Sequence, residues 1–355
     1  MPRTNPREST ASLTTTAPLR TAALSLGMLL AISGCSSTAS DRAVTTSGAS
    51  SPAAAGSGGA VAVQAGSSRV APAAKPVVVA FAGDIAAGTK GTKEYATARA
   101  TGDVVRRIAP RWALLGGDNA YPSGSPADYR TKYHPTWGSF KAISKPVPGN
   151  HEYRTAGAAG YRQYFFAGAS RPYYVFSAGN RWRVYMLNCE IACGAGSAQE
   201  RWLRKDLAAN RTAHVLAVLH RPRYSSGLHG SDTRATALWN ALVASKADVV
   251  LSGHDHGYEV FAKQDAYGRA RPTDGIKEFV NGTGGAEMYP FGSPRRNSLK
   301  RLNTDFGVLK LSLSASAYSW QFVASGYCWR HDKRTACTSR TGKVLDSGAR
   351  RTNRA

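Results

Sequence analysis

The sequence predicts an α/β protein whose strands form layers with at least one mixed β-sheet. Three observations support this fold class. Short apolar runs of strand length alternate with helical patterns in the first part of the chain and cluster in the last part. Four of five polar motifs follow directly on such a run. Sites in α/β sheets form outside the carboxyl ends of the strands, where loops converge.

Each element rests on a local pattern. Apolar runs predict strands at residues 77–81, 112–115, 183–187, 215–219, 249–251, 278–280, 308–313 and 318–323. Apolar residues at helical spacing predict a helix over 94–108, which ends before Pro110. The run Ser197-Ala198-Gln199-Glu200 reads as a capping box that opens a helix over 197–209. A further helix is expected over 232–244.

Residues 1–35 have the pattern of an export signal. Three arginines precede the apolar stretch 22–32, which is shorter than the roughly 20 residues of a stable membrane span. The stretch ends in Ile32-Ser33-Gly34-Cys35, which is similar to a bacterial lipoprotein cleavage box. We therefore expect an exported cell-envelope lipoprotein, attached to the membrane through lipid on Cys35. A plain secretory signal with a chance cysteine, and hence a secreted protein, is the alternative.

The rest of the chain divides into three parts. Residues 36–75 are dominated by Ala, Ser, Gly, Thr and Val and predict a flexible tether. Residues 76–325 carry the strands, helices and motifs of a catalytic domain. Residues 326–355 are expected to form a basic C-terminal tail with a local disulfide.

Four cysteines remain if Cys35 carries lipid. An even number in an exported protein favours two disulfides, and the spacing favours Cys189 with Cys193 and Cys328 with Cys337. Four cysteines allow three pairings. Zinc binding is less favoured, because these cysteines lie away from the histidine motifs.

The formal net charge of +24 and the pI near 10.2 favour anionic partners. Such partners include phosphorylated substrates, nucleic acid and acidic envelope polymers, although solubility explains the charge equally well. The sequence has no long Lys/Arg run and no nucleic-acid-binding module, so a specific nucleic-acid partner is not expected.

Five polar motifs carry the chemistry. They are Gly83-Asp84, Gly117-Asp118-Asn119-Ala120-Tyr121, Gly149-Asn150-His151-Glu152, His220-Arg221-Pro222 and Gly253-His254-Asp255-His256. Carboxylate and amide oxygens suit hard cations, and imidazoles suit Zn, Fe or Mn. A carboxylate shared by two ions holds them about 3.5–4 Å apart, the spacing used in phosphoryl hydrolysis. A lone Asp or His is more often structural, but the five motifs together predict a two-metal site.

In their order, these motifs resemble the calcineurin-like metallophosphoesterases over roughly residues 76–325. Two details resemble the purple acid phosphatase branch. Ala86 stands where most of the family has a histidine, and Tyr121 stands three residues after the second aspartate. Two details depart from that branch: the first motif reads Gly83-Asp84-Ile85-Ala86 rather than Gly-Asp-x-Gly, and Val260 replaces a frequent arginine.

The resemblance implies a four-layer α/β/β/α sandwich with two mixed β-sheets and a dimetal centre at the sheet edges. It implies that Asp84, Tyr121 and His256 bind one ion, that Asn150, His220 and His254 bind the other, and that Asp118 bridges them. A Tyr121 phenolate favours Fe(III) at the first position. The second ion would be Fe, Zn or Mn.

The implied reaction is hydrolysis of a small phosphate monoester by attack of a metal-bound hydroxide. His151 and His229 match positions that the family uses for substrate contact and proton donation. His151 could instead support the metal site, and His229 could be a loop histidine. Arg221, Arg223 and Tyr224 could contact phosphate or face solvent.

Two other functions remain open. A phosphodiesterase or nucleotidase would use the same ligands with a different pocket. A non-catalytic polyanion-binding envelope lipoprotein would use the basic surface and a degenerate centre.

Overall fold

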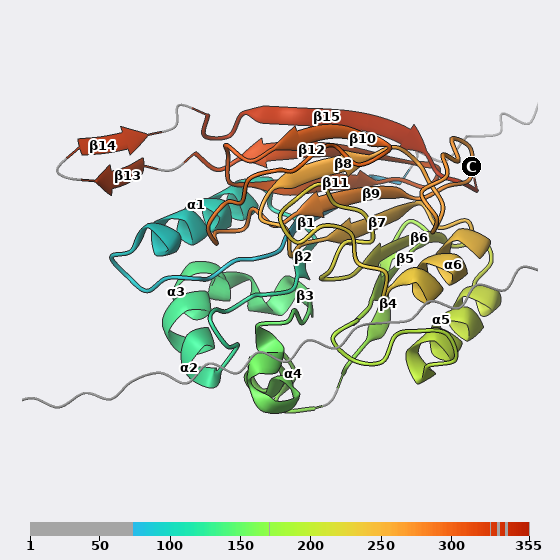
Figure 1. Cartoon of the computed structure of the whole chain (residues 1–355), viewed down its shortest axis with the longest axis horizontal. Coiled ribbons are helices and arrows are strands. Elements are labelled where there is room, and N and C mark those ends of the chain that lie inside the picture. The colour runs from blue at the N-terminus through green and yellow to red at the C-terminus, as the bar shows by residue number, and fades with distance from the viewer. Residues whose placement is uncertain (1–73, 170, 327, 332–333, 338–339, 355) are drawn as a thin grey trace, which may run out of the picture. The chain divides into compact units, whose positions relative to one another are not determined.

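The computed structural model describes residues 74–169, 171–326, 328–331, 334–337 and 340–354 (Figure 1). The expected export signal, Cys35 and all but the end of the expected tether lie outside these residues. Within the described residues, no helix has the length and apolar character needed to cross a membrane.

The first sheet has six strands in the order β15-β12-β11-β1-β2-β3. The bounds are β1 (Val77–Ala82), β2 (Trp112–Gly116), β3 (Ser144–Val147), β11 (Gly307–Leu313), β12 (Ala317–Ala324) and β15 (Val344–Arg351). Strands β1, β2 and β3 pair in parallel, whereas the β1–β11, β11–β12 and β12–β15 pairs are antiparallel. The sheet is therefore mixed, as predicted.

The second sheet has seven strands in the order β10-β8-β9-β7-β6-β5-β4. The bounds are β4 (Tyr174–Gly179), β5 (Trp182–Met186), β6 (His214–Val218), β7 (Val249–Ser252), β8 (Tyr258–Phe261), β9 (Lys277–Asn281) and β10 (Ser298–Leu302). Its central strands β5, β6, β7 and β9 are parallel, and its outer pairs are antiparallel. This sheet is mixed too.

The helical elements are α1 (Lys93–Ile108), α2 (Pro126–Asp128), η1 (Tyr129–Tyr133), α3 (His134–Trp137), η2 (Gly138–Ile143), η3 (Glu152–Arg154), η4 (Ala156–Ala158), α4 (Ala159–Phe166), α5 (Ala198–Ala209) and α6 (Thr236–Ala244). Helix α1 ends at Ile108, and Ala109 caps it in the left-handed conformation just before Pro110. Ser197 caps α5 by accepting from the Glu200 amide, as predicted. The Glu200 carboxylate instead accepts from the Gly196 amide, one residue before the expected partner.

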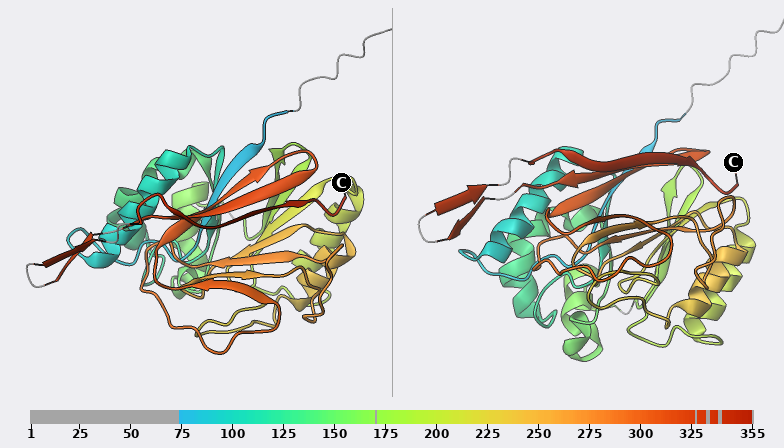
Figure 2. Two further views of the ribbon diagram at one scale, coloured as in Figure 1. Left: turned by 90° about the horizontal axis from the view of Figure 1, so that it is seen from above. Right: turned by 45° about the horizontal axis from the view of Figure 1, so that its top comes forward.

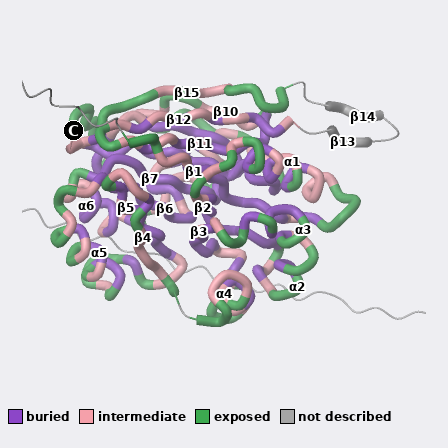
Figure 3. Tube along the Cα trace, turned by 180° about the vertical axis from the view of Figure 1, so that it is seen from behind, coloured by how far each residue is buried: buried purple, intermediate pink, exposed green. Residues whose placement is uncertain are grey.

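Three apolar clusters show how the layers stack. Between the sheets, Phe81 and Leu114 of the first sheet share a buried cluster with Val184 and Leu251 of the second. On the outer face of the first sheet, residues of α1 join residues of β1 and β2; on the outer face of the second, residues of α5 and α6 join residues of β5 and β6. The order is helix, sheet, sheet, helix (Figures 1 and 3). The predicted four-layer α/β/β/α sandwich is confirmed.

The C-terminal segment differs from the expectation. Residues 326–355 were expected to form a tail outside the catalytic domain, yet β15 pairs with β12 over most of its length and completes the first sheet. The Asp346 carboxylate accepts from the Tyr258 hydroxyl at 2.7 Å and from the Trp320 indole at 2.9 Å. The folded unit therefore continues through this strand, well past the expected boundary at residue 325.

A two-stranded hairpin separates β12 from β15. It consists of β13 (Cys328–His331) and β14 (Arg334–Cys337), and Figure 2 shows it beyond the end of the larger sheets. The backbone register sets position 328 opposite position 337. The expected disulfide between these cysteines lies outside the described side chains and stays a prediction.

Candidate metal centre

The five motifs meet at one edge of the two sheets. Asp84 follows β1, Asp118 follows β2 and Asn150 follows β3 in the first sheet. His220 follows β6, and His254 and His256 follow β7, in the second sheet. Within each sheet these strands are parallel, so their carboxyl ends open on the same side. The topology brings together residues that lie up to 172 positions apart in the chain.

One group of side chains surrounds the Tyr121 hydroxyl. That oxygen lies 2.9 Å from Oδ1 of Asp84, 3.0 Å from Nε2 of His256 and 3.4 Å from Oδ2 of Asp118. Nε2 of His256 is in turn 3.3 Å from Oδ1 of Asp84. These four side chains present one phenol oxygen, two carboxylates and one imidazole nitrogen to a common point.

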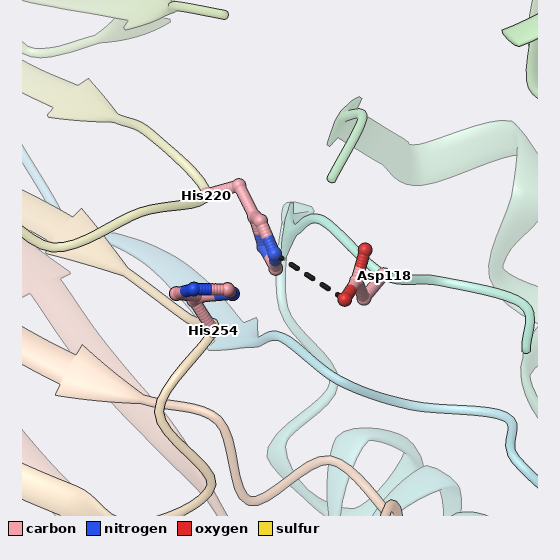
Figure 4. A group of neighbouring side chains, drawn as sticks. All are labelled: Asp118, His220 and His254. Carbon is pink, nitrogen blue, oxygen red and sulfur yellow. Dashed lines mark ion pairs between the residues drawn. The ribbon is translucent and has the colours of Figure 1, made fainter. Parts of the chain in front are cut away.

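A second group surrounds His220. Its Nε2 lies 3.1 Å from Oδ1 of Asn150 and 3.3 Å from Oδ2 of Asp118. Asp118, His220 and His254 each place one possible ligand atom within 4.8 Å of the others (Figure 4). Oδ2 of Asp118 therefore borders both groups, which is the position a bridging carboxylate requires.

The backbone around the site is unusual. Three of the expected ligands have a positive φ, namely Asp84 at 60°, Asp118 at 48° and His254 at 68°. Left-handed backbone at non-glycine residues is strained and concentrates at functional sites. Gly149 and Gly253 pack so closely that an added Cβ would lie 2.2 Å from Oδ1 of Asp118 and 2.6 Å from Oδ2 of Asp84, respectively. Glycine at these two positions therefore leaves the space that the two carboxylates occupy.

Backbone carbonyls fix the orientation of two histidines. Nδ1–H of His220 donates to the carbonyl of Gly116 at 2.8 Å, and Nδ1–H of His256 donates to the carbonyl of Glu287. Each ring then directs Nε2 into the site. Metal-binding histidines are held in this way, with the remaining ring nitrogen bonded to a carbonyl or carboxylate.

Burial and neighbouring charges shift the pKa values of several side chains in this group. Burial alone would raise the pKa of Asp118 and lower that of His220. Their mutual attraction outweighs burial, lowering the pKa of Asp118 to about 2 and raising that of His220 to about 10. Burial, followed by the charges of Asp84 and Asp118, raises the pKa of Tyr121 well above its usual value. A phenolate at Tyr121 therefore needs a cation beside it.

The donor set fits two ions. It combines two buried carboxylates, a phenol, an amide oxygen and three imidazoles, and one of the two carboxylates, Asp118, borders both groups. Burial, together with His220 and Arg221, lowers the pKa of His254, which keeps its ring neutral and leaves one ring nitrogen unprotonated.

The two expected catalytic histidines contact different members of this set. His151 packs against the Tyr121 ring at 4.3 Å between centroids, and its Nδ1–H donates to the carbonyl of Pro122 at 2.7 Å. Its Nε2 is then directed toward Oδ2 of Asp118, 3.8 Å away. His229 is exposed and stacks on His254 with centroids 4.3 Å apart. Both rings therefore border the expected ligands.

Two residues were not expected from the sequence. Glu152 is fully buried; it accepts from the amides of Asn119, Ala120 and Gly149 and from the Tyr129 hydroxyl, so it ties two ligand loops together. Tyr289 stacks on His256 with centroids 4.0 Å apart. Glu152 stood within a quoted motif, whereas Tyr289 had no signal beyond an aromatic residue after a glycine-rich turn.

The sequence left open whether the three residues Arg221, Arg223 and Tyr224 contact phosphate, and the structure places them in different surroundings. Arg223 donates to the carbonyl of Ala266 at 2.8 Å, and the Tyr224 hydroxyl donates to the carbonyl of Asp265 at 3.0 Å, both away from the ligands. Arg221 donates to Nε2 of His254 at 2.7 Å and to Oε1 of Glu190 at 2.7 Å. Glu190 lies between Cys189 and Cys193, which form the expected disulfide.

The chain belongs to the calcineurin-like phosphoesterase family, whose model matches residues 69–258, more than half of the sequence. It is 27% identical over 246 residues to the probable purple acid phosphatase 20 of Arabidopsis thaliana, covering 61% of this chain and 54% of that protein. The predicted family and its purple acid phosphatase-like character are confirmed. Calcineurin-like phosphoesterases bind dimetal centres, in agreement with the donor set above.

Solved structures show the same fold. Purple acid phosphatase PPD1 from yellow lupin (Lupinus luteus) aligns with a TM-score of 0.61 at 18% identity, over 77% of this chain and 53% of that one. GAP50, the anchor in the inner membrane complex of Plasmodium, aligns with a TM-score of 0.58 at 16% identity, over 79% and 90%. The chain spans about half the length of the two plant proteins. At these identities the structural matches concern the fold alone.

Proposed function

We propose that this protein is an exported dimetal phosphatase that hydrolyses phosphate monoesters. The observation that carries the proposal is the position of Asp118, whose Oδ2 lies 3.4 Å from the Tyr121 hydroxyl and 3.3 Å from Nε2 of His220. A single carboxylate oxygen thus borders the two groups of donors. A mononuclear or purely structural site would not need it.

In this proposal, one ion is held by Asp84, Tyr121 and His256, and the other by Asn150, His220 and His254, with Asp118 between them. Two ions bound there would activate water and neutralise charge on the phosphoryl oxygens. Tyr121 as a phenolate makes Fe(III) the preferred first ion. The second ion would be Fe, Zn or Mn, all of which accept imidazole and amide ligands.

The remaining side chains would act on the substrate. Nε2 of His151 is the ring nitrogen left for a phosphoryl or leaving-group oxygen, because Nδ1–H is engaged by Pro122. Burial lowers the pKa of His151, so a proton-donating role for this ring would favour activity in acid solution. His229, exposed beside His254, would also contact the substrate. The net charge of +24 would attract anionic substrates toward the protein.

The deciding experiment compares hydrolysis of 4-nitrophenyl phosphate with hydrolysis of bis(4-nitrophenyl) phosphate. Faster turnover of the monoester is expected, and a preference for the diester would favour the phosphodiesterase alternative. Asp118→Asn should abolish hydrolysis and leave polyanion binding unchanged. Loss of both properties, or of neither, would contradict the assignment.

Visible absorption tests the first ion. Purified protein with Fe(III) should show a charge-transfer band that disappears in Tyr121→Phe. A colourless active enzyme would contradict the iron assignment while leaving a dimetal phosphatase of other composition.

A further inference from the structure

Arg221 stands between the metal centre and a buried acid. Its Nε donates to Oε1 of Glu190 at 2.7 Å, and its second terminal nitrogen, Nη2, is 3.4 Å from Oε2 of the same carboxylate. Its first terminal nitrogen, Nη1, donates to Nε2 of His254 at 2.7 Å. The side chain is 21% exposed, so the guanidinium lies at the rim of the site rather than beneath it.

The bond to His254 has a chemical consequence. A guanidinium only donates and does not lose its proton, so Nε2 of His254 must be the acceptor. A neutral imidazole has one unprotonated nitrogen, hence Nδ1 of His254 carries the proton. A metal ion also needs an unprotonated ring nitrogen. His254 can therefore satisfy Arg221 or a metal ion, but not both.

This exclusion holds whichever nitrogen the ion takes. An ion at Nε2 would displace the Nη1 group directly. An ion at Nδ1 would move the proton to Nε2, and two donors would then face each other across 2.7 Å. A metal ion bound by His254 would consequently break the Arg221–His254 hydrogen bond.

Glu190 would keep the released guanidinium in place. Its carboxylate is 8% exposed and sits in the five-residue loop that the Cys189–Cys193 disulfide closes. The Glu190 amide donates to Oδ1 of Asn188 at 2.9 Å, and Asn188 exchanges two hydrogen bonds with the Gln199 side chain of α5. The acid is thus fixed independently of the metal ligands.

We propose that Arg221 is a phosphate-binding residue, released from His254 by metal loading and held at the rim by Glu190. Glu190 engages Nε and Nη2, which leaves Nη1 free for a phosphoryl oxygen. Guanidinium N–H groups match phosphate oxygens in geometry and charge. The inference rests on the proposed function, and it adds the ligand class of this residue: the phosphoryl group of a monoester, or free orthophosphate as product.

The test uses Arg221→Gln and two measurements with opposite expected signs. Affinity of the metal-free protein for Zn²⁺, measured against a competing chelator, should rise about threefold or more, because a competitor for His254 and a nearby positive charge are removed. The inhibition constant of orthophosphate and the KM for 4-nitrophenyl phosphate should rise about tenfold, with a smaller change in kcat.

Arg234→Gln is the matched control. Nη1 of Arg234 lies 3.8 Å from Oε2 of Glu190, and among the described residues the ion pairs and hydrogen bonds of its side chain run to Asp232, Glu190 and Cys189 rather than to His254. This variant should leave both measurements unchanged. Arg221→Lys should recover part of the phosphate affinity, because it restores the charge without the fork of donors.

Glu190→Gln provides a second variant in case Arg221→Gln folds poorly. It leaves the guanidinium without its buried counter-charge, so phosphate binding should weaken while Zn²⁺ affinity stays equal or falls. Weaker binding of both Zn²⁺ and phosphate in Arg221→Gln would mean a structural role and would overturn the proposal. Unchanged phosphate binding would also overturn it.

The outcomes separate this inference from the proposed function. If Asp118→Asn bound Zn²⁺ as tightly as the wild type does, both the proposed function and the Arg221 proposal would be contradicted. If metal binding and hydrolysis depended on Asp118 but phosphate affinity were unchanged in Arg221→Gln, only the Arg221 proposal would be contradicted.

Discussion

Nε2 of His220 lies 3.3 Å from Oδ2 of Asp118, and both side chains are buried. Without a bound ion the two residues would form an ion pair that holds one proton, because their attraction lowers the pKa of Asp118 to about 2 and raises that of His220 to about 10. A metal ion that binds both must displace this proton.

The first prediction follows from that displacement. Below the pKa of His220 at about 10 and above that of Asp118 at about 2, metal binding should release one proton from this pair. Affinity should therefore fall as the pH falls, by about tenfold per pH unit for one proton. Calorimetric titration of metal-free protein with Zn²⁺ in buffers of different ionisation enthalpy measures the proton count. A binding heat that does not depend on the buffer would contradict it.

The second prediction concerns Glu152. Replacing it by alanine leaves the amides of Asn119, Ala120 and Gly149 without their buried acceptor. We expect the free energy of unfolding to fall by about 3 kcal/mol or more, as for other buried groups that lose their partners. Urea denaturation of metal-free protein gives the value. Glu287→Ala, at an exposed side chain, should change stability by less than about 0.5 kcal/mol.

The third prediction tests the close approach at Gly149. An added Cβ would lie 2.2 Å from Oδ1 of Asp118 and 2.6 Å from its amide nitrogen, so Asp118 must move. Gly149→Ala should lower kcat/KM by about a hundredfold, the scale of a small displacement in a catalytic constellation. Gly194→Ala adds the same methyl group where no atom lies within 4 Å and serves as the control. Equal activity in the two variants would show that Asp118 tolerates displacement.

The fourth prediction concerns the Cys189–Cys193 disulfide. The loop it closes carries Glu190, which holds Arg221. A double Cys→Ser variant should lose about 2 kcal/mol of stability, from the loop-closure entropy of a five-residue ring. Its KM for 4-nitrophenyl phosphate should rise more than its kcat falls. Denaturation and steady-state kinetics, each with and without reductant, measure both effects. Reductant should lower the stability and raise the KM of the wild type, and it should leave both values of the variant unchanged.

The sequence was most informative where a polar residue that could bind a metal follows directly on a predicted strand. Asp84, Asp118 and His220 were predicted as ligands because each follows a buried apolar run, and the parallel strands bring such positions to one edge. The structure brings these side chains together, and their role as ligands stays a prediction. The same periodicity predicted the central strands of both sheets. It missed β3, where Pro146 interrupts a four-residue strand, and the edge strand β10, whose sequence is largely polar and basic. It also missed β4 and β8, which pair antiparallel with β5 and β9.

Other features depend on contacts that no local pattern encodes. Tyr289 and His256 are 33 residues apart, and their stacking follows from the path of an irregular loop. Glu190 and Arg221 belong to separate strand-end loops and pair only because β5 and β6 are neighbours. The role of β15 was missed for a similar reason: its residues are mostly exposed, so they carry little apolar signal, and its partner β12 precedes it by some twenty residues.

The pairing of β15 with β12 also bears on how the polypeptide can be shortened. Strand β12 alternates its aromatic residues Tyr318, Trp320 and Phe322 toward the interior, and β15 covers its outer hydrogen-bonding edge. A polypeptide cut before residue 344 would retain every expected ligand yet present an uncapped, aromatic-rich border to neighbouring molecules. Self-association, rather than loss of chemistry, would then be the first defect to appear.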